Sequence, residues 1–350
     1  MKLNKYQNQH IQSMEKYLKQ IKSLYYDSIE SATQMAESIQ FNELKAFRFK
    51  DYPQLSQRAD ALFNRLNREL SLITTEGINT EWESAMKKND DIVSYLFGKD
   101  NVDKFPQTVL DKYFNHNDDA RIAFMKRNYG GVSLSDRVWK YTKQFKQEIE
   151  MGIDVGLMDG KPASKMATEM KQYLNAPDKL FRRVRNARGV LQLSKNALAY
   201  HPGQGVYRSS YKNAYRMART EINMAYQAAD AQRWKQLDFV VGIRVNLSAA
   251  HPKYDICDEM VGDYPKEFKF TSWHPACICY ATPILKTEKE IADDTTKLLQ
   301  GKSTNCVSKN KVYDTPKNFK KWIVDHKDYI SKAKDDGKLP YFIRNNKSFF

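Results

Sequence analysis

The fold is decided by residues 209–245, which read SSYKNAYRMARTEINMAYQAADAQRWKQLDFVVGIRV. Ser209 or Ser210 is a favourable N-cap, and apolar residues recur at helical spacing from there to about Leu237. The β-branched run 239–245 predicts a strand directly after this helix. We therefore expect a long amphipathic helix packed against a small sheet. The apolar stripe of the helix contains Tyr211, Ala214, Tyr215, Ala218, Ile222, Ala225, Tyr226 and Ala229.

Two charged residues, Arg219 and Glu221, lie at opposite margins of this stripe, because successive helical residues are about 100° apart. Charged side chains in such positions usually cover the core with their stems and hydrogen-bond through their heads. We expect this structural role for both rather than catalysis.

The regions before this helix are also predicted to be helical. In residues 4–72 apolar side chains recur at spacings of three and four, and Pro53 divides them into two runs. Residues 73–79 are predicted to form a turn. Further on, Ser135 is predicted to cap one helix and Pro162 to begin the next, which together would form an αα-hairpin.

The chain is expected to be mainly α, with helical N-terminal and middle regions and a small α+β domain that carries a Cys/His-bearing turn. The stretch HPGQG at 201–205 is the clearest linker. Residues 268–273 are predicted to add a strand, and Tyr341 and Phe342 to form an exposed docking segment. The expected segments are a helical N-terminal region (1–118), a basic helical hairpin with its linker (119–205), the α+β domain (206–286) and a polar helical tail (287–350).

Positive charge is concentrated in one region. The net charge is +15, and residues 121–235 hold 22 Lys and Arg against 9 Asp and Glu. This predicts a negatively charged partner, nucleic acid foremost, although a solvated helix face or contact with an acidic protein would have the same pattern. The candidate nucleic-acid-binding residues, in a stretch predicted as helical, are Lys179, Arg182, Arg183, Arg185, Arg188 and Lys195.

Long apolar segments are absent from the sequence. Residues 1–22 are polar and of mixed charge, so we expect no secretory signal. No run approaches the ~18 apolar residues that a membrane span needs. We expect a protein made in a reducing cytoplasm, with no membrane partner.

Three of the four cysteines lie in the short region 257–279, together with one histidine. Thiolates and an imidazole at this spacing can close a tetrahedral zinc site. Four protein ligands would leave no position for water, so such a zinc would be structural. The candidate ligands are Cys257, His274, Cys277 and Cys279.

Other interpretations of this cluster stay open. The cysteines could be buried reduced thiols or form a disulfide, and His274 could be a hydrogen-bonded turn residue. His251 is a substitute ligand, which Asp255 or Asp258 could assist, and Cys306 is expected to be uninvolved. A zinc deaminase site is excluded, because the residue two positions after His251 is not glutamate.

The order of these motifs resembles the phage head morphogenesis family, the Mu F-like minor head proteins. The resemblance covers residues 211–285 and departs from the family pattern at Met260, where many members have a second cysteine, and at Ile278, where arginine is usual. It is carried by Ala218-Arg219-Thr220-Glu221 on a helix, a strand, Asp255-Ile256-Cys257-Asp258 followed by Gly262, and His274-Pro275-x-Cys277-x-Cys279.

The resemblance implies a non-enzymatic minor structural protein of a tailed-phage head. Such a protein would lie inside the head near the portal and act in assembly, having been made in the host cytoplasm. Its implied partners are the portal protein, the major capsid or other head proteins, and double-stranded DNA.

Two other functions stay open. Mu F-like domains are sometimes joined to ADP-ribosyltransferases, and Arg244, Thr271-Ser272 and Glu288-Lys289-Glu290 occur in the order which that chemistry needs. The chain could also be a cellular zinc-stapled nucleic-acid-binding protein that belongs to no particle.

Overall fold

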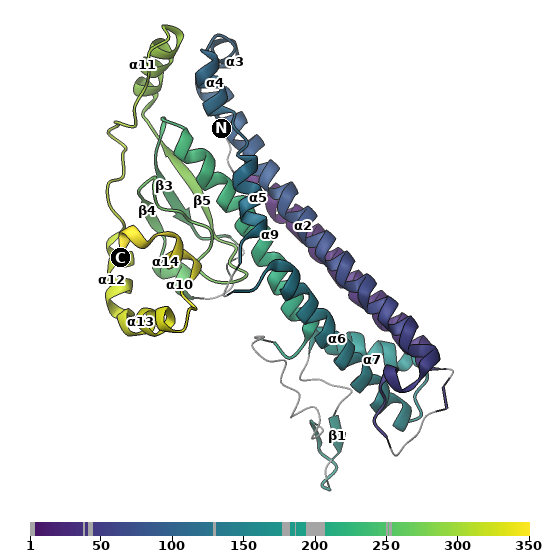
Figure 1. Cartoon of the computed structure of the whole chain (residues 1–350). Helices are drawn as coiled ribbons and strands as arrows, with labels where there is room; N and C mark the ends of the chain where they lie inside the picture. Colours follow the sequence, from purple (N-terminus) through teal and green to yellow (C-terminus); the bar gives the residue numbers. More distant parts are fainter. Residues whose placement is uncertain are drawn as a thin grey trace. The chain divides into compact units, whose positions relative to one another are not determined.

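The computed structural model describes residues 4–37, 39–40, 45–128, 131–176, 183–185, 187–193, 207–249, 251 and 254–350. They are mainly α-helical with a small antiparallel sheet, which confirms the expected fold class (Figure 1). They form two compact units: unit 1 is Met1–Glu15, Glu76–Gly130 and Arg219–Phe350, and unit 2 is Lys16–Thr75 and Gly131–Ala218. Three helices contribute residues to both units, namely α1 (Asn4–Ala36), α2 (Pro53–Phe97) and α9 (Ser210–Gln236).

Unit 2 is helical and has a buried aromatic cluster. Tyr25 packs edge-on against Phe145 and Tyr211, with ring centroids 4.7 and 5.4 Å apart. The buried carboxylate of Glu148 accepts hydrogen bonds from the Tyr173 hydroxyl at 2.8 Å and from the Ser210 N–H at 3.0 Å. The further elements of this unit are η1 (Phe49–Asp51), α6 (Leu134–Met158), α7 (Ala163–Asn175) and the paired strands β1 (Arg183–Arg185) and β2 (Leu191–Leu193).

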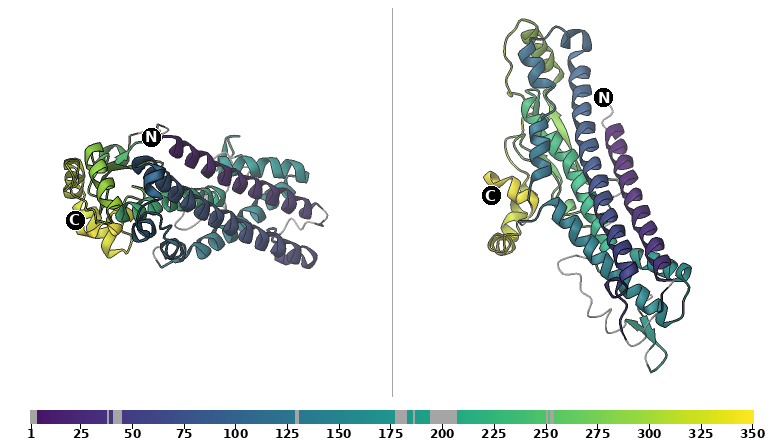
Figure 2. Two further views of the ribbon diagram at one scale, coloured as in Figure 1. Left: turned by 90° about the horizontal axis from the view of Figure 1, so that it is seen from above. Right: turned by 45° about the vertical axis from the view of Figure 1, so that its right-hand side comes forward.

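Helices α6 and α7 pack together as the predicted hairpin (Figure 2). The cap, however, is Ser133 and not Ser135: its hydroxyl accepts the Asp136 N–H at 3.1 Å, and the Asp136 carboxylate accepts the Ser133 N–H at 3.0 Å. This reciprocal pair needs a suitable side chain three residues after the cap, which Ser135 does not have. Gly156 permits the close approach of α7, because a Cβ there would lie 2.3 Å from Sδ of Met166.

Unit 1 contains a three-stranded antiparallel sheet of order β4-β3-β5. The central strand β3 (Val240–Asn246) follows α9 as predicted, and pairs with β4 (Gly262–Tyr264) and β5 (Tyr280–Leu285). The other elements are α3 (Lys99–Val102), α4 (Gln107–Tyr113), α5 (Asp118–Lys126), α10 (Ile256–Glu259), α11 (Glu288–Leu299), α12 (Lys317–Asp325), α13 (Lys327–Asp335), α14 (Tyr341–Asn345) and η2 (Lys347–Phe349).

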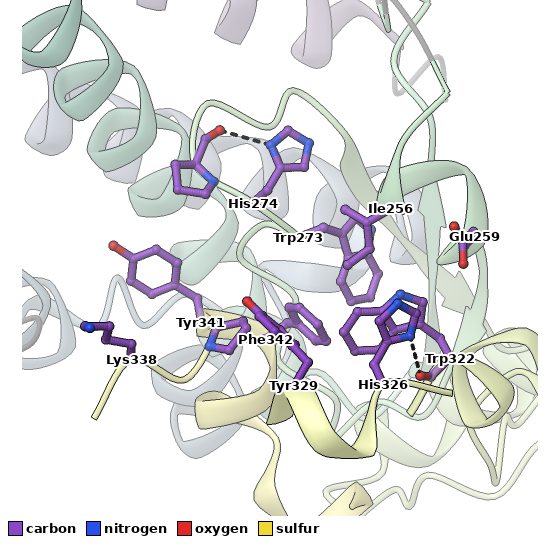
Figure 3. A pocket seen from close by; sticks show the side chains of 12 residues that line it. Ile256, Glu259, Trp273, His274, Trp322, His326, Tyr329, Lys338, Tyr341 and Phe342 are labelled. Carbon is purple, nitrogen blue, oxygen red and sulfur yellow. Dashed lines mark hydrogen bonds between the residues drawn. The ribbon is translucent and has the colours of Figure 1, made fainter. Parts of the chain in front are cut away.

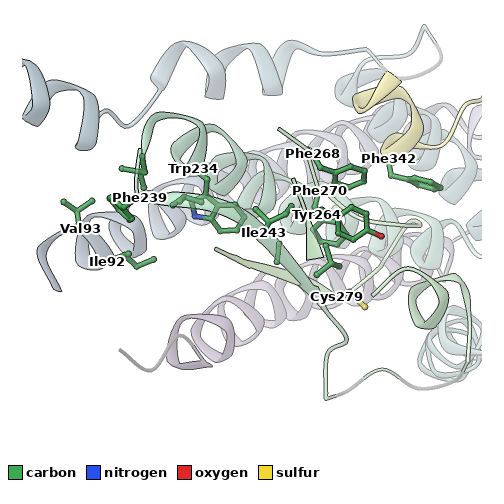
Figure 4. Close-up of a cluster of buried hydrophobic side chains, with 14 of the residues drawn as sticks. Ile92, Val93, Trp234, Phe239, Ile243, Tyr264, Phe268, Phe270, Cys279 and Phe342 are labelled. Atoms are coloured by element: carbon green, nitrogen blue, oxygen red, sulfur yellow. The ribbon is translucent and has the colours of Figure 1, made fainter. Parts of the chain in front are cut away.

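The core of unit 1 joins the sheet to α2, α9 and the C-terminal helices (Figure 4). Trp234 of α9 and Phe239 before β3 lie in one buried cluster with Val93 of α2 and Phe342 of α14. The same cluster contains Cys257, Cys277 and Cys279. The candidate zinc ligands therefore border the main core of this unit.

Two predicted local structures are wrong. Residues 73–79 belong to α2, where the Thr74 hydroxyl donates to the Leu70 carbonyl at 2.8 Å and Ile78 is buried. Residues 268–273 form no strand, because the Asn346 side chain binds both backbone groups of Lys269, accepting from N–H at 2.6 Å and donating to C=O at 3.0 Å.

Two further predictions need correction. Residues 183–185 and 191–193 pair as antiparallel strands rather than forming a helix, and Gly189 between them has φ 72°. Tyr341 and Phe342 are buried, so they form no exposed docking segment.

None of the described helices is both long and apolar enough to cross a membrane. Each compact unit is built from several separate stretches of the chain, so its bounds differ from those of the four expected segments. The division into four domains stays a prediction.

Candidate metal centre

The predicted zinc ligands come from α10 and from the loop that precedes β5. Cys257 lies on α10, whereas Cys277 and Cys279 end the loop. Asp255 caps α10 by accepting the Cys257 N–H at 2.7 Å, and the Asp258 carboxylate accepts the Asp255 N–H at 2.8 Å. This capping box fixes the short helix and thereby the position of the Cys257 thiol.

Cys257 is the shared member of the cluster. Its Sγ lies 3.2 Å from Nε2 of His274 and 3.6 Å from Sγ of Cys277. Ligand atoms around a tetrahedral zinc lie about 3.3–3.8 Å from one another, because each is about 2.0–2.3 Å from the metal. The two distances from Cys257 therefore match a zinc site to within a few tenths of an ångström, and the ligand atoms of all three residues lie within 4.8 Å of one another.

The fourth predicted ligand, Cys279, belongs to a second group with Cys257 and His251. The three ligand atoms of that group lie within 4.8 Å of one another. Nε2 of His251 is hydrogen-bonded to the Asp258 carboxylate at 2.9 Å, and this contact raises the pKa of His251. The structure thus brings a second histidine to the cluster, as the sequence allowed.

His274 has the arrangement expected of a ligand. Its Nδ1 lies 3.0 Å from the Pro275 carbonyl, so the tautomer that donates there leaves Nε2 free to face Cys257. Metal-binding histidines typically make such a hydrogen bond through the other ring nitrogen. Nε2 also lies 3.2 Å from the Asp255 carboxylate. The geometry therefore favours His274 over His251 as the ligand.

The three thiols are buried and affect one another. Hydrogen bonds from the Cys257 and Cys279 thiols lower the pKa of Cys277 well below its ordinary value, and the charge of His274 acts in the same direction. The same thiol pairing raises the pKa of Cys257. A thiolate is the form that binds zinc, so Cys277 is already biased toward the ligand state.

One face of α9 holds the cysteine loop. The Thr220 hydroxyl oxygen accepts the Ala276 N–H at 2.8 Å, and the Asn223 side-chain amide donates to the Cys277 carbonyl at 3.0 Å. Gln227, one turn further, accepts the Ala281 N–H at 3.4 Å. Positions three and four apart share a helix face, so the helix contacts both the loop and the strand after it.

Two further residues of the resemblance, Glu221 and Gly262, have clear structural roles. Glu221 is 1% exposed and forms an ion pair of 2.5 Å with Arg127, whereas Arg219 is half-buried. Gly262 has φ 149°, and a Cβ there would lie 2.7 Å from Pro316. The turn after α10 therefore needs glycine for both conformation and space.

A cavity of about 470 Å³ adjoins the centre (Figure 3). Ile256 and His274 line it on the side of the centre, and Trp273, Trp322, His326, Tyr329, Tyr341 and Phe342 supply aromatic walls. His274 is partly exposed, whereas the three thiols are buried. Solvent thus reaches the centre through the His274 side.

The predicted nucleic-acid-binding residues are only partly covered by the structure. Lys179, Arg182 and Lys195 lie outside the described residues. Arg183 and Arg185 are in β1, and Arg188 is exposed in the turn that follows. Their role in binding stays a prediction.

A buried polar network in unit 1 was missed by the sequence analysis. Nδ1 of His10 lies 2.5 Å from Glu81, its Nε2 lies 2.9 Å from Asn223, and Lys88 forms a buried ion pair with Asp230. The partners are distant in sequence and no motif links them, so no local signal could have paired them. Through Asn223 this network reaches the Cys277 carbonyl.

Comparison with known proteins identifies no relative of the chain. No protein-family model, curated protein or solved structure matches the chain.

Proposed function

We propose that this chain is a non-enzymatic minor head protein of a tailed phage, with a structural zinc held by Cys257, His274, Cys277 and Cys279. The observation that carries the proposal is the contact between the parts of the resemblance. Thr220 of the helical motif binds the backbone of the closing Cys/His loop at Ala276. The helical motif and the Cys/His loop are thus packed together. This supports a structural role for these residues rather than a catalytic one.

The character of the centre supports a structural role for the metal. Cysteine and histidine donors suit zinc, Cys257 lies close to both His274 and Cys277, and the loop beside them is held by hydrogen bonds to α9, although Cys279 is grouped with Cys257 and His251 instead. Four protein ligands leave no position for a reacting water. Zinc in this site would link α10 to the segment before β5.

Arg244 and Glu290 of the ADP-ribosyltransferase alternative have structural partners of their own. Arg244 pairs with both carboxylate oxygens of Asp263, at 2.6 and 2.8 Å. Glu290 accepts the Thr287 N–H at 2.9 Å in the capping box of α11, and Thr271 is buried. These contacts favour the non-enzymatic proposal.

The proposed location is inside the head near the portal, after synthesis in the host cytoplasm, with portal, head proteins and double-stranded DNA as partners. Mass spectrometry of purified particles from the encoding strain tests this. We expect peptides of the chain in the density fraction of DNA-filled heads, and none there when the chain is expressed without other phage genes. Detection only in the unassembled lysate would overturn the proposal.

A further inference from the structure

Unit 2 contains a groove of about 760 Å³ between α6 and the segment that leads into η1 and includes its first turn. One wall is formed by residues 46–50. The other is one face of α6, whose lining residues recur at helical spacing: Lys143, Lys146, Gln147, Glu150, Met151 and Asp154.

The carboxylates of this groove are used to hold its two walls together. Asp154 accepts the Phe47 N–H at 2.7 Å, and Glu150 accepts the Phe49 N–H at 3.1 Å. The rings of Phe47 and Phe49 are buried. The segment 46–50 is therefore fixed on α6, and its alternate residues are directed away from the core.

Those alternate residues and α6 supply exposed cations on both walls. Arg48, Lys50 and Lys143 are exposed, and none of the three forms an ion pair within 4.0 Å of a described residue, although the charges of Arg48 and Lys50 act on the Glu150 carboxylate. Lys146 pairs with Asp60 at 2.7 Å. Lys143 also lies 5.1 Å from the ring centroid of Trp139, which is 57% exposed.

The groove suits a phosphate backbone better than a protein surface. Protein interfaces have an apolar centre from which charged residues are depleted, whereas six of the ten residues that line this groove are charged, and its four cations outnumber the carboxylates of Glu150 and Asp154. Closely placed cations neutralise successive phosphates and need no base contacts.

We propose that this groove binds the backbone of double-stranded DNA without regard to sequence, through Arg48, Lys50 and Lys143. The inference rests on the DNA-contact part of the proposed function and gives it a site distinct from residues 179–195. Lys146 is not required, because Asp60 already neutralises it.

Fluorescence anisotropy with a labelled random-sequence duplex, measured from low to high NaCl, tests the groove on the full chain. The test variant is Arg48→Gln/Lys50→Gln/Lys143→Gln. The control, Lys327→Gln/Lys332→Gln/Lys334→Gln, removes the same charge from exposed positions on α13. Circular dichroism melting checks that both variants fold like the wild type.

Three phosphate contacts contribute about 2.7 to the slope of log affinity against log salt. We expect the groove variant to lose that slope, and affinity on the order of 10²-fold at 0.1 M salt, while the control keeps both. Equal affinity and equal salt slope for the two variants would overturn the proposal that DNA binds in the groove. The same holds if polyglutamate, added at the same total charge as the duplex, displaces the duplex. If the wild-type chain does not bind DNA, the inference is overturned. The proposal that the chain is part of the phage head would still be decided separately, by mass spectrometry of purified particles.

Discussion

The hydroxyl oxygen of Thr220 accepts a hydrogen bond of 2.8 Å from the backbone N–H of Ala276. Ala276 has φ 63°, a left-handed conformation that costs a residue with a Cβ about 1–2 kcal/mol. The contact thus holds a strained residue between His274 and Cys277. The helix motif and the candidate centre depend on each other through this bond.

Replacing Thr220 with valine should destabilise unit 1 by about 1–2 kcal/mol, because the Ala276 N–H loses its acceptor. Urea unfolding measures the change. Thr296→Val is the control, since that exposed hydroxyl donates to the Ala292 carbonyl of its own helix and its loss should change stability by less than about 0.5 kcal/mol. Equal effects of the two substitutions would show that the Thr220 contact is unimportant.

The two histidines of the centre should differ in their effect on zinc. His274→Ala should lower zinc affinity by more than the ~10–100-fold typical of losing an outer partner, whereas His251→Ala should stay within that range. Competition with a chromophoric chelator measures both variants. The reverse order would assign the ligand role to His251.

The buried ion pair of Lys88 and Asp230 should be costly to break on one side. Lys88→Met leaves the buried Asp230 carboxylate without its counter-ion and with a hydrogen bond from Asn89, so we expect a loss of about 3–5 kcal/mol. Lys88→Met/Asp230→Asn should recover much of this. The control Lys112→Met breaks an exposed pair with Asp238 and should cost at most about 1 kcal/mol. A denaturation series in which all three variants agree would contradict this.

Stability should depend on Glu290 in acid. Hydrogen bonds from Ser308 and from the backbone of Thr287 and Lys309 lower its pKa from 4.5 to about 2. The unfolded chain therefore takes up the proton first as pH falls, and the contribution present above about pH 4.5 is lost toward pH 2. The melting temperature of Glu290→Gln should lie below that of the wild type at pH 6 and approach it as the pH falls through this window. A constant difference would refute the assignment.

A separate prediction concerns DNA binding by the arginines of residues 179–195. Neutralising Arg182, Arg183, Arg185 and Arg188 should weaken DNA binding and lower its salt dependence, because each phosphate contact contributes about 0.9 to the slope. Filter binding against the wild type measures this. Unchanged binding would leave the groove on α6 as the DNA site.

The sequence could predict features whose signals are local. The stripe of α9 has a clear period, and the helix and its buried face are confirmed. The candidate ligands between Cys257 and Cys279 are close along the chain and could be proposed from spacing alone, but their role in binding zinc stays a prediction. The pairing of strands 183–185 and 191–193 could not be predicted, because three-residue strands are too short to show a period, and Gly189 is the one local sign of a turn between them. His10 and Glu81 could not be paired, since each alone resembles a solvated charge on a helix and their contact depends on tertiary packing.

The central claim is that the chain holds a structural zinc, and the most direct test is to measure its zinc content together with the number of sulfur ligands. X-ray absorption and elemental analysis of the full chain, purified without chelators, should give one zinc per chain with three sulfur ligands at about 2.3 Å and one nitrogen at about 2.0 Å. Cys277→Ser, the matched variant, should lose the metal and its local fold. A wild-type chain that is folded, reduced and free of zinc after equilibration with the metal would contradict the account.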